Sequence, residues 1–231
     1  MAGNMALRGL GTFLAAAVLL VMPARALAGE SGEYSFTVLR DGRPIGQHRI
    51  AIDHEGDRVE INEATDIEVR FAGFTIYKLF YRAHQLWQNG RAVRIDARTD
   101  NNGETLDIAV RPDGDGYVRT VNGRTDRFSR TMHVFALWTM DTLKYGSFFS
   151  IVEDKILQVS FKLIGRERLK VADRAIAVDH YEMSGSERRE LWFDTAGHLV
   201  KLALRRGGSN IQYLRDQLTP HRVTLTCAQD C

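Results

Sequence analysis

The chain has 231 residues, 44% of them hydrophobic, with 31 Lys+Arg against 29 Asp+Glu and two cysteines. Charges of both signs are interspersed, whereas nucleic-acid binding needs a concentrated basic stripe, so the composition argues against a nucleic-acid ligand. A chain of this length can bury one sizeable hydrophobic core.

The first segment, residues 1–28, has the three parts of a cleavable secretory signal peptide. Arg8 lies in a short leading region, residues 10–22 are a continuous apolar run, and residues 26–28 read Ala-Leu-Ala. The alternative is a membrane anchor, but the run is shorter than the ~20 residues that a spanning helix needs. We therefore expect cleavage after Ala28 and a bacterial protein in the periplasm or outside the cell, with no membrane span after cleavage.

Removal of this leader also changes the charge of the protein. The leader holds Arg8 and Arg25 and no acidic residue, so the basic side chains that remain equal the 29 acidic ones in number. The mature chain then has no formal net charge, which again excludes nucleic acid as the partner.

After the leader, turn signals alternate with segments of period-two hydrophobicity, the pattern of half-buried strands. In 59–71, for example, Ile61 and Ile67 share one face while Asn62 and Glu68 share the other. The same pattern predicts strands at 33–40, 45–54, 91–100, 104–111, 116–122, 155–169, 174–184, 187–194, 198–206 and 209–216. Strands joined by short hairpins form an antiparallel meander, and the lack of alternating long helices argues against a parallel α/β sheet.

The strand predicted at 74–87 is apolar on both faces, whereas a strand in a sheet with one solvent-exposed face should be apolar on one face only. One face carries Phe74, Ile76 and Phe80, and the other carries Tyr77, Leu79, Tyr81 and Trp87. Either the core covers one face and a helix the other, or one face lines an apolar ligand groove with aromatic walls. Both interpretations hold together if the helix is a movable lid.

That helix is predicted at 131–145, where strand alternation is lost. Thr131 can cap its start and Gly146 its end, and Phe135, Trp138 and their neighbours make it apolar nearly all round, as in a buried helix. The predicted fold class is all-β (mainly), an antiparallel meander forming a strongly curved sheet or partly open barrel with one helix packed in the concavity. We expect a single β-rich domain at 29–216 and a C-terminal tail at 217–231.

The tail holds both cysteines, Cys227 and Cys231. In an oxidising compartment such a pair indicates a disulfide, although it would close only a small loop and stabilise little. A metal site is the alternative, but two thiolates without nearby histidines are an incomplete ligand set for zinc. We expect no metal and no cofactor.

Catalytic patterns are weak throughout the chain. His133 and Asp141 are eight positions apart, a poor spacing for an acid–base pair, and Ser147 and Ser150 lie outside any G-x-S-x-G turn. The acidic turn at 113–116 has only part of a calcium-loop ligand series. No catalytic residue is assigned, and the expectation leans away from an enzyme.

Two motifs resemble a known family. The sequence YSFTVLRDGRPIGQHRI at 34–50 and the hairpin sequence ERRELWFDTAGHLVKLAL at 187–204 are similar to exported bacterial proteins grouped as domain of unknown function 6134. The resemblance implies an exported β-rich domain and supplies no activity. A long sheet curled about a helix also resembles periplasmic lipoprotein carriers, an architectural likeness only.

From these patterns we expect non-catalytic binding of an apolar or amphipathic envelope molecule, such as a lipid-like small molecule. The candidate ligand-binding residues are Phe74, Tyr77, Phe80, Tyr81, Trp87, Phe135 and Trp138, as cavity walls and lid. The alternative is an envelope scaffold or protein-assembly partner that binds through a sheet edge.

Overall fold

The computed structural model of the chain describes residues 31–128, 133–137 and 139–217. The predicted signal peptide at 1–28 and the cysteine pair at Cys227 and Cys231 lie outside the described residues. Within the described ranges, no helix is long and apolar enough to cross a membrane.

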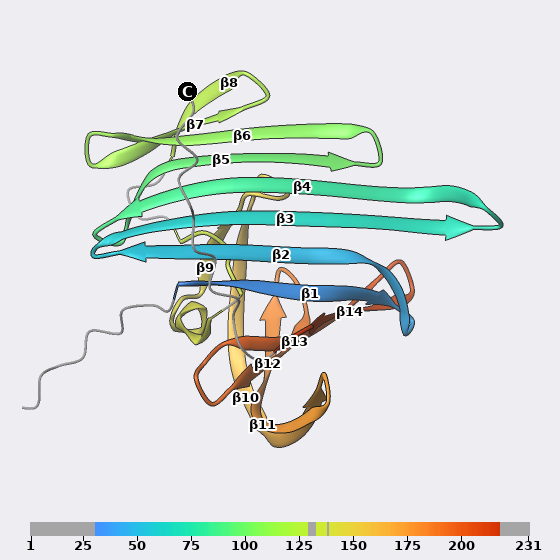
Figure 1. Cartoon of the computed structure of the whole chain (residues 1–231). Helices are drawn as coiled ribbons and strands as arrows, with labels where there is room; N and C mark the ends of the chain where they lie inside the picture. Colours follow the sequence, from blue (N-terminus) through green and yellow to red (C-terminus); the bar gives the residue numbers. More distant parts are fainter. Residues whose placement is uncertain (1–30, 129–132, 138, 218–231) are drawn as a thin grey trace, which may run out of the picture.

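One antiparallel sheet of 14 strands makes up the described structure (Figure 1). The strands are β1 (Gly32–Arg40), β2 (Arg43–Glu55), β3 (Arg58–Phe71), β4 (Phe74–Gln88), β5 (Arg91–Asn101), β6 (Glu104–Asp113), β7 (Gly116–Val121), β8 (Arg124–Phe128), β9 (Ser147–Ser150), β10 (Lys155–Val171), β11 (Arg174–Gly185), β12 (Arg189–Asp194), β13 (Leu199–Arg206) and β14 (Ser209–Arg215). Their order is β8-β7-β6-β5-β4-β3-β2-β1-β14-β13-β12-β11-β10-β9. The sheet is therefore two meanders joined where β1 pairs with β14, and it ends in two edges rather than closing.

The turns between strands have the geometry that their sequences predict. Asn89 and Gly90 both have positive φ, 51° and 71°, as a tight two-residue hairpin turn requires. The turn from β3 to β4 is different, because Ala72 adopts φ 49° before Gly73. An alanine rarely adopts this left-handed conformation, so this turn is held by the pairing of its strands and not by local preference.

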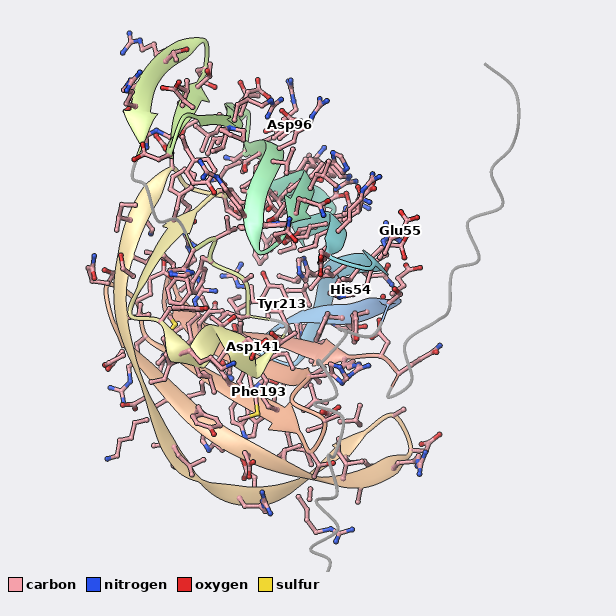
Figure 2. The ribbon with its side chains drawn as sticks, turned by 90° about the vertical axis from the view of Figure 1, so that its left-hand side faces the viewer. His54, Glu55, Asp96, Asp141, Phe193 and Tyr213 are labelled. Atoms are coloured by element: carbon pink, nitrogen blue, oxygen red, sulfur yellow. The ribbon has the colours of Figure 1, made fainter. Side chains whose placement is uncertain are left out.

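The sheet curls about an apolar interior, so that one face of each strand is buried. In β1 the buried residues Tyr34, Phe36 and Val38 alternate with less buried ones. The larger core cluster contains Tyr34, Phe36, Ile50, Ile52, Ile61, Leu137, Phe148, Leu157, Val159, Met183, Leu191, Phe193, Leu199 and Leu202. A second cluster under β4 to β7 includes Ile95, Val110 and Phe149. The curled sheet and its interior are seen from the side in Figure 2, with Phe193 labelled.

The predicted α-helix at 131–145 was wrong. The described part of this segment contains extended chain and one short 3₁₀ helix, η1 (Met140–Lys144). Val134 forms a parallel bridge with Phe149, and the Phe135 amide donates to the Phe149 carbonyl at 2.9 Å. Pairing with β9 satisfies the backbone, and β-branched residues such as Val134 favour extended chain. The segment still packs inside the curl, since Leu137 belongs to the core.

Candidate functional site

A cavity of about 190 Å³ lies inside the curled sheet. It is bounded by β1 to β4, by β12 to β14 and by the segments around Phe135 and Ser150. Its lining residues are Phe36, His48, Ile50, Glu63, Thr65, Leu79, Tyr81, Phe135, Leu137, Ser150, Val152, Glu153, Arg189, Leu199, Leu202, Leu204, Arg206 and Tyr213. Most of this wall is aliphatic or aromatic, with polar groups on β2, β3 and β4 and a second set at Ser150, Glu153, Arg189 and Arg206.

His48 is the first of these polar groups. Its Nδ1 lies 2.7 Å from the Thr65 Oγ1 on the paired strand, and Phe36 and Tyr213 lie on either side with ring centroids 6.0 and 5.9 Å away. Burial lowers the pKa of His48 to about 4, because the charged imidazolium would lose its hydration. The imidazole is therefore neutral at pH 7.

Glu63 is the second. Burial raises the pKa of its carboxyl to about 7, although the Gln85 side-chain amide donates to Oε1 at 2.6 Å and lowers it in part. Trp87 Nε1 in turn donates to the Gln85 Oε1 at 3.2 Å. The pKa of Tyr81 is also raised well above its ordinary value, first by burial and then by Glu63. At pH 7 this wall thus presents a neutral imidazole at His48 and a Glu63 carboxyl that is about half protonated.

A chain of ion pairs lies at the mouth of the cavity. Arg206 Nη2 on β13 lies 3.0 Å from a Glu153 carboxylate oxygen, and Lys155 Nζ lies 2.9 Å from Glu187 Oε1. Glu187 also accepts from Arg189 Nε at 2.9 Å, and the Arg189 guanidinium lies 4.8 Å from the centroid of the Phe135 ring. The mouth therefore carries charges of both signs, whereas burial disfavours the charged forms of His48 and Glu63 in the interior.

A second hollow of about 350 Å³, the vestibule, adjoins this mouth. Leu79, Val152, Glu153 and Arg206 line both the vestibule and the cavity. Tyr77 and Leu106 add further walls to the vestibule. The shared residues place the vestibule directly beside the cavity.

Three of the predicted binding residues lie at these hollows. Tyr81 and Phe135 line the cavity, and Tyr77 lines the vestibule. Their side chains come from β4 and from the extended segment before η1. Their role in ligand binding remains a prediction.

Of the other four predicted residues, the three that the structure describes do not line the cavity. Phe74 is 75% exposed at the β3–β4 turn, and Phe80 is 39% exposed on the opposite face of β4 from Tyr81. Trp87 packs between the two core clusters. Trp138 lies outside the described residues.

The groups considered for catalysis are held in local contacts. The His133 ring stacks on Tyr145 with centroids 3.6 Å apart, and Asp141 pairs with Lys144 Nζ at 2.6 Å. Figure 2 labels Asp141 on η1. Among the described residues no cluster of His, Cys, Asp and Glu could hold a metal ion.

His48, Glu63 and Gln85 are the residues that the sequence interpretation missed. A signal for Glu63 is visible, since it has the same parity as Ile61 and Thr65 and so lies on the inward face of β3. A charged residue on an otherwise buried face marks a structural or functional polar site.

Comparison with known proteins supports the fold and gives a family. Residues 36–216 match the profile of domain of unknown function DUF6134. The chain belongs to this family. A DUF6134 domain thus occupies nearly all of the described sheet.

A solved structure similar to this DUF6134 chain is a β-barrel-like protein of domain of unknown function DUF1849 from Brucella abortus. The TM-score is 0.60 at 9% sequence identity, with 82% of this chain and 96% of that chain covered. The likeness shows a shared β-barrel-like fold. Comparison with curated proteins found no match.

Proposed function

We propose that the protein binds a small amphipathic envelope molecule without catalysis, and that the cavity holds its apolar part. The observation that carries this proposal is the cavity itself: a mostly aliphatic and aromatic wall with hydrogen-bonding groups on β2 to β4 and charged groups at its mouth. Binding sites for small molecules share this composition, an apolar lining with a few polar groups that fix orientation.

The size and charge of the cavity narrow the ligand class. Its volume of about 190 Å³ is smaller than the ~300–1,000 Å³ of pockets that enclose whole drug-sized ligands. It therefore suits one hydrocarbon chain segment, with the rest of the molecule in the vestibule. Because an unpaired charge is costly to bury, the group that reaches His48 and Glu63 is a neutral one such as a hydroxyl or carbonyl.

Export supports the same function. The leader at 1–28 would place the protein in the cell envelope, where amphipathic molecules are abundant. N-terminal sequencing of protein recovered from the periplasm or the medium tests this: the first residue should be Gly29.

A titration with the probe N-phenyl-1-naphthylamine tests binding. We expect saturable fluorescence enhancement with the native protein, and binding about tenfold or more weaker for Leu79→Trp, which puts an indole at the junction of cavity and vestibule. The matched control is Leu163→Trp, because Leu163 is 54% exposed on β10. Mass spectrometry of an organic extract of native protein should also detect a bound lipid-like molecule.

Two results would contradict the binding proposal. Native protein that shows no saturable binding and releases no extractable molecule would have a filled or inert interior. Equal binding by Leu79→Trp and Leu163→Trp would place the probe elsewhere.

The scaffold alternative has less support. The edge strand β8 carries Arg124, Asp126 and Arg127, and charged edge residues discourage strand addition. The other edge strand, β9, is bonded through Phe149 to the segment at His133 and Phe135. Pulldown with native protein and with charge-reversed β8 separates the two: a scaffold would lose partners, a carrier would not.

A further inference from the structure

The β3–β4 hairpin projects beyond the strands on both of its sides. The last residue of β3 paired to β2 is Ile67, opposite Gly46, and the first residue of β4 paired to β5 is Leu79, opposite Asn101. Residues 68–77 therefore pair only within the hairpin, and the Lys78 carbonyl accepts from the Asn102 amide at 2.8 Å. This arm is the longest projection of the sheet in Figure 1, at the right of the view.

Three large apolar side chains are exposed at the end of this arm. Phe71 and Phe74 lie directly opposite each other across the two-residue turn and are 72% and 75% exposed, and the neighbouring Ile76 is 53% exposed. Single exposed apolar residues are ordinary, but a group at an apex marks an interaction site. We call these three residues the hairpin tip.

Basic residues surround the same end of the molecule. Arg70 and Lys78 lie on the arm. Because the strands are antiparallel, the β1–β2 turn and the β13–β14 turn also lie at this end. The Asp41 amide donates to the Asn210 carbonyl at 2.8 Å, so these two turns lie side by side. The basic residues of these two turns are Arg40, Arg43, Arg205 and Arg206.

The opposite end of the sheet differs in charge. The β2–β3 turn there contains Glu55 and Asp57, and the β6–β7 turn contains Asp113 and Asp115. Arg40, Arg70 and Arg206 at the tip end pair with Asp41, Glu68 and Glu153, and the tip end still carries more basic than acidic side chains, whereas the turns at the other end are mainly acidic. An anionic surface would attract the tip end and repel the other.

We propose that the hairpin tip docks the protein on a lipid bilayer that carries anionic headgroups. Phe71, Phe74 and Ile76 enter the interface, and the surrounding arginines and lysine face the phosphates. Aromatic and aliphatic residues next to basic ones are the chemistry of membrane-surface binding. A protein partner that binds a concave groove fits less well, because the apolar residues lie at the end of a projecting hairpin.

Docking in this way would bring the vestibule close to the membrane. From the tip, the inward face of the hairpin continues through the pairs Val69–Tyr77 and Ile67–Leu79, and Leu79 lines the cavity. The apolar track therefore runs from bilayer to interior. Docking does not depend on cavity binding, since the tip and the cavity are separate surfaces.

Co-sedimentation of the exported protein with vesicles tests the proposal. The vesicles contain phosphatidylethanolamine with phosphatidylglycerol, or phosphatidylcholine alone. We expect binding to the anionic vesicles that weakens with added salt, and a loss of about tenfold or more in partitioning for Phe71→Ser/Phe74→Ser. The matched control is Leu163→Ser/Ile164→Ser, because these residues are 54% and 51% exposed on β10 and should bind as the native protein does.

The contrary outcomes are equally specific. No sedimentation of native protein, or equal sedimentation of the tip variant, overturns the proposal. Lipid-free self-association that the tip variant loses, without vesicle binding, would assign the tip to a second copy of the chain. Naphthylamine binding in the cavity, measured on the same variants, should be unchanged, so failure of docking and failure of the binding proposal are distinguishable.

Discussion

Glu63 and His48 line one cavity, and burial displaces their pKa values so that they act in opposite senses on the pH dependence of stability. The pKa of Glu63 rises from 4.5 in the unfolded chain to about 7. Between these values the unfolded chain loses a proton that the folded protein keeps, so stability falls as pH rises. The pKa of His48 falls from 6.5 to about 4, so over that range the unfolded chain binds a proton that the folded protein does not, and stability rises with pH.

The two effects are of similar size. Each pKa difference of about 2.5 units corresponds to roughly 3 kcal/mol at about 1.4 kcal/mol per unit. Between pH 4.5 and 6.5 the slopes oppose each other and nearly cancel. In the native protein these two groups together should therefore change the free energy of unfolding little between pH 4.5 and 6.5.

Single substitutions should reveal each contribution. Relative to the native protein, Glu63→Gln should gain stability from pH 4.5 to 7, by a total of about 3 kcal/mol, because it removes the ionisation penalty of the buried carboxyl. Relative to the native protein, His48→Gln should gain stability as pH falls from 6.5 to 4. The measurement is urea unfolding at steps of pH, with each variant compared with native protein so that surface groups cancel. A Glu63→Gln difference that stays constant from pH 4.5 to 7 would refute the burial of this carboxyl.

Two further predictions concern the frame of the sheet. Gly46→Ala should destabilise by about 1–3 kcal/mol in urea unfolding, because the added Cβ would lie 2.0 Å from the Asp66 carbonyl oxygen, whereas Gly165→Ala, with nothing within 4 Å, should be nearly neutral. Equal stability of the two variants would contradict this. Phe193→Ala should cost about 3–5 kcal/mol, since this ring is fully buried in the larger core, and a cost below 1 kcal/mol would argue against that packing.

The strands could be predicted because their signals are local. Alternation at 209–216 corresponds to β14 (Ser209–Arg215), and the turn at Asn89-Gly90 joins two predicted strands as expected. The pairing of β1 with β14 could not be predicted in this way, because it joins the first and the last strand in chain order, in the middle of the sheet. β9 was missed because it lies just beyond the segment assigned to a helix, and β8 because five mostly polar residues carry little periodicity.

The site was predictable in part, for a geometric reason. Alternation separates Tyr81 from Phe80, and only Tyr81 faces the interior. Phe74 pairs with Phe71 at the end of the hairpin, which extends beyond the neighbouring strands, so its ring is exposed at the tip. How far one strand extends past the next depends on register between strands, which period-two patterns do not contain.

The error about the helix changes the expected route into the cavity. A helix lying in the concavity could move as a lid, whereas the described extended segment is bonded at two places. Phe135 and Phe149 share a backbone hydrogen bond at one end, and Met140 donates to the Gly197 carbonyl at 2.9 Å at the other. Opening at this segment would break both contacts and expose Leu137 of the core. At the vestibule the boundary with the cavity includes the Glu153–Arg206 ion pair, and partly exposed pairs of this kind contribute about 1 kcal/mol or less. The route of lower cost therefore lies beside β4, on the hairpin that carries the tip.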